Sequence, residues 1–259
     1  MMRKIGTDPI NLEVHESGSG EPLLFLHSAQ GFDERQEIAG LLAARRRLIA
    51  PSHPGFGRSS LPDWLDSVDD IAYVYLQLLD EFKISRLDLI GCSIGAWIAA
   101  EMATKAPERI ARLVLVGPVG VKLGPVDRLD IPDIFAMPQD EVDKLMFHQP
   151  ARMKMDPSKL TDEELAIRLR NRETLALLTW EPWMHNPKLK HRLQRASMPA
   201  LLVRGESDGL VSDSYLQGFA RLMPRAKTQT IPAAGHAPQI EQPKAFAEAV
   251  LRFLDESSR

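Results

Sequence analysis

The sequence contains one cysteine, Cys92, among its 259 residues. An intramolecular disulfide is therefore excluded, and nothing in the sequence indicates an oxidising compartment. Residues 1–14 lack the apolar core of a signal peptide. No apolar run approaches the ~20 residues that are needed to span a bilayer. We therefore expect a cytoplasmic protein that has no membrane partner.

The sequence also lacks an excess of charge of either sign, with a formal net charge of −3. Such a weak field is not enough to hold nucleic acid. The histidines and carboxylates show no metal-ligand spacing, and Gly55-x-Gly57 lacks the third glycine of a dinucleotide motif. We expect no nucleic-acid partner, no metal and no cofactor, and a small molecule as the substrate. The oligomeric state is left open, with a homodimer as one option.

Short apolar runs alternate with segments of helical periodicity. Strands are expected at 10–16, 22–27, 47–52, 86–91, 112–118, 199–205 and 228–233, and helices at 33–46, 67–83, 94–106, 212–223 and 243–256. This alternation predicts an α/β fold with a mostly parallel sheet and right-handed crossovers. Because only residues 18–21 join the first two apolar runs, we expect those two strands to pair antiparallel at one edge.

Residues 121–196 interrupt the alternation. They hold no convincing strand, whereas 138–148 and 161–180 have helical patterns. Thr161 followed by Glu164 resembles a capping box at the start of the second pattern. The sequence therefore predicts a core domain of residues 1–120 and 197–259 and a helical lid of residues 121–196.

A serine stands between two glycines at the end of one strand-like run. Gly91-x-Ser93-x-Gly95 is followed at once by a helical segment, as a nucleophile elbow requires. Side chains two residues away on either side would collide in so sharp a turn, which also forces strained backbone angles on Ser93. The amide of Ile94 lies at a helix N-terminus and can donate to an oxyanion. Ser93 is the predicted nucleophile; the alternative is a packing turn with an incidental serine.

A serine nucleophile needs a base and an acid that orients the base. His236 lies in a glycine-flanked turn after the last expected strand, and Asp208 follows the preceding strand. Both positions are at carboxyl ends of strands, where ligands bind in open α/β sheets. Glu206 is the rival acid, and Cys92 is expected to be a small buried residue. The histidines expected in surface or structural roles are His15, His53, His148, His185 and His191.

These motifs together resemble those of α/β-hydrolase-fold enzymes with a helical lid inserted between strands six and seven. "FLHSAQG" resembles the family's oxyanion segment, "SHPGFGRSS" its Pro-Gly loop, "GESD" its acid loop and "GHAPQIEQP" its histidine loop. The resemblance implies an eight-stranded sheet with helices on both faces. It also implies that the amide of Ala29 joins that of Ile94 in the oxyanion hole, although Ser28 replaces the usual glycine. The serine sets the chain apart from haloalkane dehalogenases and epoxide hydrolases, whose nucleophile is an aspartate.

The lid is rich in methionine and aromatic side chains, so we expect a small to medium apolar or aromatic carboxylic ester as substrate. Ser28, Phe147 and Trp183 are the predicted substrate-binding residues. One alternative is a carbon–carbon hydrolase of meta-cleavage products, a group that the lidded architecture resembles closely. Against it, Ala237 replaces that group's tryptophan after the catalytic histidine, and its asparagine near the oxyanion segment is not evident. A second alternative is a low-turnover ligand receptor on the same fold.

Overall fold

The computed structural model describes residues 1–154 and 156–256. Within them, eight strands form one sheet in the order β1-β2-β4-β3-β5-β6-β7-β8. The neighbours from β4 to β8 pair in parallel, whereas β1 with β2 and β2 with β4 pair antiparallel. The strands are β1 (Met2–Ile5), β2 (Ile10–Ser17), β3 (Pro22–Leu26), β4 (Arg47–Pro51), β5 (Leu87–Cys92), β6 (Ile110–Val116), β7 (Ala200–Gly205) and β8 (Ala226–Ile231).

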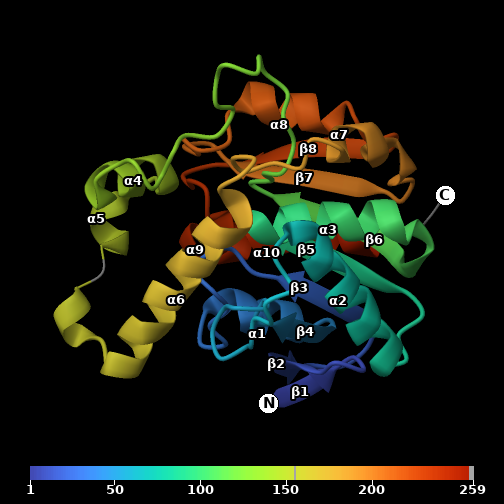
Figure 1. Ribbon diagram of the computed structural model, residues 1–259. Coiled ribbons are helices and arrows are strands. Elements are labelled where there is room, and N and C mark those ends of the chain that lie inside the picture. Colours follow the sequence, from blue (N-terminus) through green and yellow to red (C-terminus); the bar gives the residue numbers. More distant parts are fainter. Residues whose placement is uncertain (155, 257–259) are drawn as a thin grey trace.

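Helices cover both faces of this sheet (Figure 1). The helices are α1 (Glu37–Ala43), α2 (Val68–Glu81), α3 (Ile94–Lys105), α4 (Gln139–Met146), α5 (Pro150–Met153), α6 (Asp162–Thr179), α7 (Leu189–Arg192), α8 (Asp213–Ala220), α9 (Pro238–Glu241) and α10 (Pro243–Asp255). Apolar side chains of α1 and α10 fill the core on one face, and those of α2, α3 and α8 fill the core on the other. The predicted fold class is confirmed.

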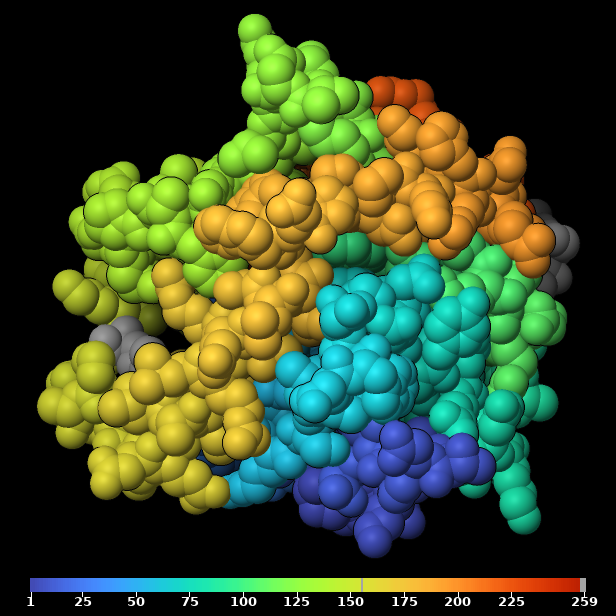
Figure 2. Space-filling model, in the orientation of Figure 1, coloured from blue at the N-terminus to red at the C-terminus, as the bar shows by residue number. Residues whose placement is uncertain are grey.

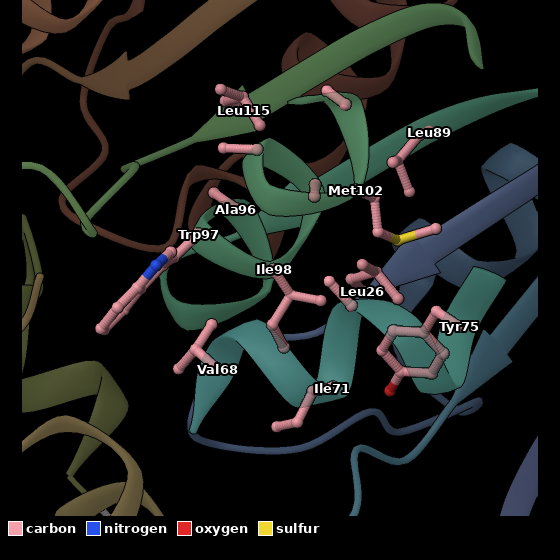
Figure 3. Close-up of a cluster of buried hydrophobic side chains, with 14 of the residues drawn as sticks. Leu26, Val68, Ile71, Tyr75, Leu89, Ala96, Trp97, Ile98, Met102 and Leu115 are labelled. Carbon is pink, nitrogen blue, oxygen red and sulfur yellow. The ribbon is translucent and has the colours of Figure 1, made fainter. Parts of the chain in front are cut away.

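Helix α3 is buried between the sheet and α2 (Figure 3). Its residues from Ile94 to Thr104 are all buried, and all but Glu101 and Thr104 are apolar or glycine, as expected of a helix that has no solvent-facing side. Ile98 and Met102 of α3 lie in the same cluster as Ile71 and Tyr75 of α2. This packing fixes the start of α3, and so it also fixes the residue that precedes the helix.

The expected pairing of the first two apolar runs is wrong. β2 pairs with β4, and β4 also pairs with β3, so one strand separates β2 from β3. In this connection Gly18 adopts φ +75° and packs against the chain at Ala43 and Arg46, where a Cβ would overlap two carbonyls. Buried on both faces, β3 belongs inside the sheet. The strand β1 was not expected from the sequence.

We call residues 121–196 the lid segment. Three of its helices, α4, α5 and α6, lie together on one side of the molecule (Figure 1). The helical patterns at 138–148 and 161–180 are confirmed as α4 and α6. Thr161 and Glu164 form the predicted capping box. The described part of the lid segment contains no strand, only an isolated bridge from Gly120 to His185. That this segment is a separate domain stays a prediction.

The helix expected at 33–46 is shorter and begins at Glu37. The Asp33 side chain accepts a hydrogen bond from the Arg35 amide, a local turn that competes with helix formation. Among the described helices, none is both long enough and apolar enough to cross a membrane.

Candidate active site

Ser93 occupies the joint between β5 and α3 with a strained backbone. Its φ and ψ are 55° and −116°, a region that residues other than glycine rarely adopt. A Cβ on Gly91 would overlap the Gly95 backbone, and a Cβ on Gly95 would overlap the backbone at the end of β3. The Ser93 amide donates to the carbonyl of Val116 at 2.8 Å. The two glycines therefore permit the turn that raises the Ser93 side chain above the sheet.

The structure brings His236 and Asp208 to this serine. His236 Nε2 lies 2.9 Å from Ser93 Oγ, and Nδ1 lies 3.0 Å from Asp208 Oδ2. The other carboxylate oxygen, Oδ1, accepts from the amides of Leu210 and Val211 at 2.9 Å each. With the aspartate ionised, the Nδ1 proton points to Asp208, which leaves Nε2 free to accept from the serine hydroxyl.

The rival residues lie elsewhere. Glu206 is exposed, and its carboxylate accepts from the amide of Ala233 at 3.2 Å. Cys92 is buried in the core on the α10 face of the sheet, and burial raises the pKa of its thiol. A thiol in that environment stays protonated and points away from the serine hydroxyl. The geometry therefore selects Asp208 over Glu206 as the partner of His236.

The backbone of the oxyanion segment is held by His27. His27 Nδ1 lies 2.6 Å from the carbonyl oxygen of Ser28 and donates to it. In a trans peptide the C=O and the following N–H point in opposite directions, so this bond turns the Ala29 amide away from His27. In the described chain neither Ala29 nor Ile94 donates its amide to a protein acceptor. Both residues line the same cavity as Ser93, and their roles in an oxyanion hole stay a prediction.

His27 belongs to a buried polar network. The His53 amide donates to His27 Nε2 at 3.0 Å, which places the proton of His27 on Nδ1. The His53 ring donates from Nε2 to the His27 carbonyl at 2.8 Å and accepts at Nδ1 from the Tyr75 hydroxyl at 2.5 Å. Every bond in this network uses a neutral ring.

Burial also keeps these rings neutral. It lowers the pKa of His27 to about 4, outweighing the Ser28 carbonyl and the Glu13 charge, which act in the opposite sense. Burial and the neighbouring His27 lower the pKa of His53 as well. The structural role expected for His53 is confirmed; the contribution of Tyr75 was missed because it comes from a distant helix.

A cavity of about 1120 Å³ opens above Ser93, between the sheet and the lid segment. On the surface, α4 and α5 are separated from the first part of α6 by an indentation (Figure 2). Ser28 and Phe147, two of the predicted substrate-binding residues, line the cavity. The third, Trp183, is not among its lining residues: its indole donates to the Ile131 carbonyl, and its ring packs against Phe135 and Trp180.

Three polar residues on one face of α6 also line the cavity: Arg168, Asn171 and Arg172. Asn171 is buried, and its Oδ1 accepts from the Gly57 amide at 2.9 Å, so its amide nitrogen is the end turned toward Gly31. In the described residues no carboxylate lies within ion-pair distance of Arg168 or Arg172. Sequence reasoning missed this face of α6. Its signal was the spacing i, i+3, i+4 of three hydrogen-bond donors.

Among the described residues, no group of three or more histidine, cysteine, aspartate or glutamate side chains is placed to hold a metal ion.

Comparisons with known proteins agree with this architecture. The chain is 28% identical over 274 residues to 2-hydroxymuconate semialdehyde hydrolase of Pseudomonas sp. (strain CF600), with 98% of this chain and 94% of that protein covered. It is 25% identical over 260 residues to 2-hydroxy-6-oxo-2,4-heptadienoate hydrolase of Pseudomonas putida, with 95% and 93% covered.

Two solved structures show the same fold. A mutant of a meta-cleavage product hydrolase from Pseudomonas fluorescens IP01 superposes with a TM-score of 0.77 at 20% identity, covering 99% of this chain and 98% of that one. A thermophilic esterase from Thermogutta terrifontis superposes with a TM-score of 0.75 at 21% identity, covering 98% of each chain. Residues 23–249 match the model of the alpha/beta hydrolase family, and the chain belongs to that family.

Proposed function

We propose that the protein is a serine hydrolase that cleaves the carbon–carbon bond of a vinylogous diketone carrying a carboxylate. The observation that carries the hydrolytic mechanism is the hydrogen-bonded chain Ser93–His236–Asp208. The substrate class is inferred from the curated relatives, whose names describe 2-hydroxy-6-oxo dienoates and 2-hydroxymuconate semialdehyde. This reverses the order of the two substrates in the sequence analysis, where the ester came first.

The geometry supports the following mechanism. Ser93 Oγ attacks the ketone carbon while His236 Nε2 takes its proton, and Asp208 stabilises the imidazolium. The amides of Ala29 and Ile94 donate to the oxyanion. The dienol first tautomerises: the carbon next to the reacting ketone gains a proton and the 2-hydroxyl loses one, which gives the vinylogous diketone. Collapse of the tetrahedral intermediate then breaks the carbon–carbon bond, and the electron pair passes through the remaining double bond to the second ketone as a dienolate, which is then protonated. Water, deprotonated by His236, releases the acyl group as a carboxylic acid.

The donors on α6 suit the substrate's carboxylate. Arg168 and Arg172 carry positive charge at the cavity wall, where Asn171 offers its amide hydrogens. The Arg172 guanidinium lies 5.0 Å from the centre of the Phe135 ring. Arginine binds carboxylates through paired hydrogen bonds. Apolar side chains form another part of the wall: Val119, Ile131, Ile134, Val142, Leu175, Met184 and Leu210. The carboxylates that line the cavity belong to Asp33, Asp140 and Asp143. We therefore place the dienoate carboxylate toward α6 and the apolar acyl group against the apolar part of the wall.

A carboxylic ester is the second candidate substrate, and one residue favours it. Ala237 follows His236, where the resemblance to meta-cleavage hydrolases calls for tryptophan. The small side chain is itself buried and supplies no aromatic wall for a planar dienoate. The same triad chemistry hydrolyses an ester, since an alkoxide leaves more readily than a carbanion equivalent.

Kinetics with both substrates distinguish these candidates. We expect kcat/KM for a 2-hydroxy-6-oxo dienoate to exceed that for a para-nitrophenyl ester, and a preference for the ester would reject the carbon–carbon assignment. Ser93→Ala should abolish turnover of either substrate without unfolding the protein. A fluorophosphonate probe should label Ser93 in the wild type; a chain that is not labelled would act as a ligand receptor instead.

The orientation of the dienoate is tested at α6. Arg172→Met should raise KM for the dienoate about tenfold, because the loss of one charged hydrogen-bonding partner costs about 1.5 kcal/mol. It should leave KM for a neutral ester within about twofold. Arg221→Met, an exposed arginine after α8, is the matched control and should change neither constant.

A further inference from the structure

One stretch of the lid segment lies directly on the two loops that carry His236 and Asp208. We call this stretch, residues 145–149, the lid strap. The amide of Gly209 donates to the Leu145 carbonyl at 2.8 Å, and the amide of His236 itself donates to the Met146 carbonyl at 2.6 Å. These bonds join backbone to backbone, so they exist whatever side chains the lid strap carries.

Two glycines allow this close approach. A Cβ on Gly235 would overlap the Met146 carbonyl, and a Cβ on Gly209 would press on Leu145. The lid strap therefore packs against the loops without an intervening side chain. Packing at this distance transmits displacement, because close-packed atoms have no void into which to yield.

The carboxylate of Glu241 bonds to both the lid strap and the loop that carries His236. Glu241, at the end of α9, accepts from the Gly235 amide at 2.6 Å and from the His148 amide at 3.2 Å through Oε2. Its Oε1 accepts from the Gln149 amide at 3.2 Å. Among the described residues no lysine or arginine forms an ion pair with this carboxylate. Backbone N–H donors from both sides of the contact therefore solvate its charge.

We propose that Glu241 is a positioning residue that couples the lid strap to His236. It rests on the function proposed above for Ser93 and His236. Met146 and Phe147 of the lid strap also line the cavity. A substrate that presses on this wall acts on the His236 backbone through the Met146 carbonyl. Glu241 holds the lid strap and the His236 loop in a fixed position relative to each other.

The test compares Glu241→Gln with the wild type in the full-length protein. A glutamine has one acceptor oxygen and turns an N–H₂ group toward the same donors, so at least one backbone amide loses its partner. We expect the rate of Ser93 labelling by a fluorophosphonate to fall about tenfold, the size of effect that a misplaced general base produces. For substrate turnover, kcat should fall while KM stays within about twofold.

Amide hydrogen exchange supplies a measurement that does not depend on catalysis. In Glu241→Gln, exchange should increase in peptides that cover the lid strap and in peptides that cover residues 233–237, and by similar factors. Glu241→Asp keeps both carboxylate oxygens on a shorter stem and should give intermediate exchange and labelling. Glu248→Gln, an exposed glutamate of α10 paired with Arg252, should behave as the wild type.

The coupling is rejected if Glu241→Gln labels at the wild-type rate, or if exchange increases in only one of the two segments. If Glu241→Gln does not fold, the same two criteria apply to Glu241→Asp. A wild type that the probe does not label would reject the serine-hydrolase proposal alone, and the exchange measurement would still decide whether Glu241 couples the two segments.

Discussion

Gly117 lies against the imidazole of His236. It follows β6 with φ +50°, and a Cβ built on it would lie 2.8 Å from Cε1 and 2.9 Å from Nδ1 of that ring. Real Cβ atoms do not approach ring atoms so closely, so only glycine leaves the ring where it contacts both Ser93 and Asp208. The position of the His236 ring therefore depends on the space left by Gly117 as well as on the hydrogen bonds to Ser93 and Asp208.

Gly117→Ala is therefore expected to displace the His236 ring and lower kcat by about 10- to 100-fold, in line with the effect of a misplacement of about 1 Å. The positive φ should also cost about 1–2 kcal/mol of unfolding free energy. Steady-state kinetics and urea unfolding measure the two effects. Gly40→Ala is the matched control, because a Cβ at that α1 position meets nothing within 4 Å. It should keep full activity; a similar loss of kcat in both variants would contradict the steric argument.

The sequence predicts Asp208 as the acid, with Glu206 as its rival, and only Asp208 contacts His236 among these two in the structure. Asp208→Asn removes the charge that stabilises the imidazolium and favours the wrong ring tautomer, so kcat should fall by about 10³- to 10⁴-fold. Glu206→Gln alters an exposed carboxylate whose one hydrogen-bond partner among the described residues is a backbone amide, and it should change kcat less than twofold. Equal losses in the two variants would mean that the acid is not Asp208.

The elbow could be predicted because its requirements are local. Gly91 and Gly95 flank Ser93 at fixed offsets, and a sharp strand-to-helix joint needs small residues at those offsets. The order of strands then brings the loops of Asp208 and His236 to the same edge of the sheet. Such features depend on chain order and local sterics, and both are visible in a sequence.

Other features could not be predicted because packing decides them. Tyr75 reaches His53 from a different element, 22 positions away in the chain, and no spacing rule connects them. The aromatic character of Trp183 says nothing of the direction in which its ring points. Likewise, the four residues between β2 and β3 are compatible with a hairpin or with a step across β4, and only the burial of β3 on both faces decides between them.

The Tyr75 hydroxyl is the last donor of the network that holds the oxyanion segment. Tyr75→Phe leaves His53 Nδ1 buried without a donor, which should cost about 1–3 kcal/mol of unfolding free energy. Without this bond, the His53 tautomer that donates from Nε2 to the His27 carbonyl is less strongly favoured, so His27 is held less firmly. We therefore expect kcat to fall several-fold with KM little changed. Tyr73→Phe, an exposed tyrosine of the same helix, is the control. Unaltered stability in Tyr75→Phe would show that the hydroxyl bond contributes nothing.

The buried histidines also make a prediction about pH. Because burial lowers the pKa of His27 to about 4 from an ordinary 6.5, the unfolded chain binds a proton between these values that the folded chain does not. Protonation of the unfolded chain therefore lowers the free energy of unfolding as the pH decreases below 6.5. For His27 alone, the decrease is about 2 kcal/mol at pH 5. The lowered pKa of His53 acts in the same direction.

Urea unfolding at pH 7, 6 and 5 measures this dependence in a range where ordinary carboxylates stay ionised in both states. His53→Gln removes one of the two titrating rings, keeps a donor and an acceptor in the side chain, and should make the decrease of stability toward pH 5 shallower than in the wild type. His191→Gln, an exposed histidine of α7, should keep the wild-type slope. Parallel slopes in the wild type and His53→Gln would mean that the network binds its proton as readily in the folded as in the unfolded chain, and that burial does not keep these rings neutral.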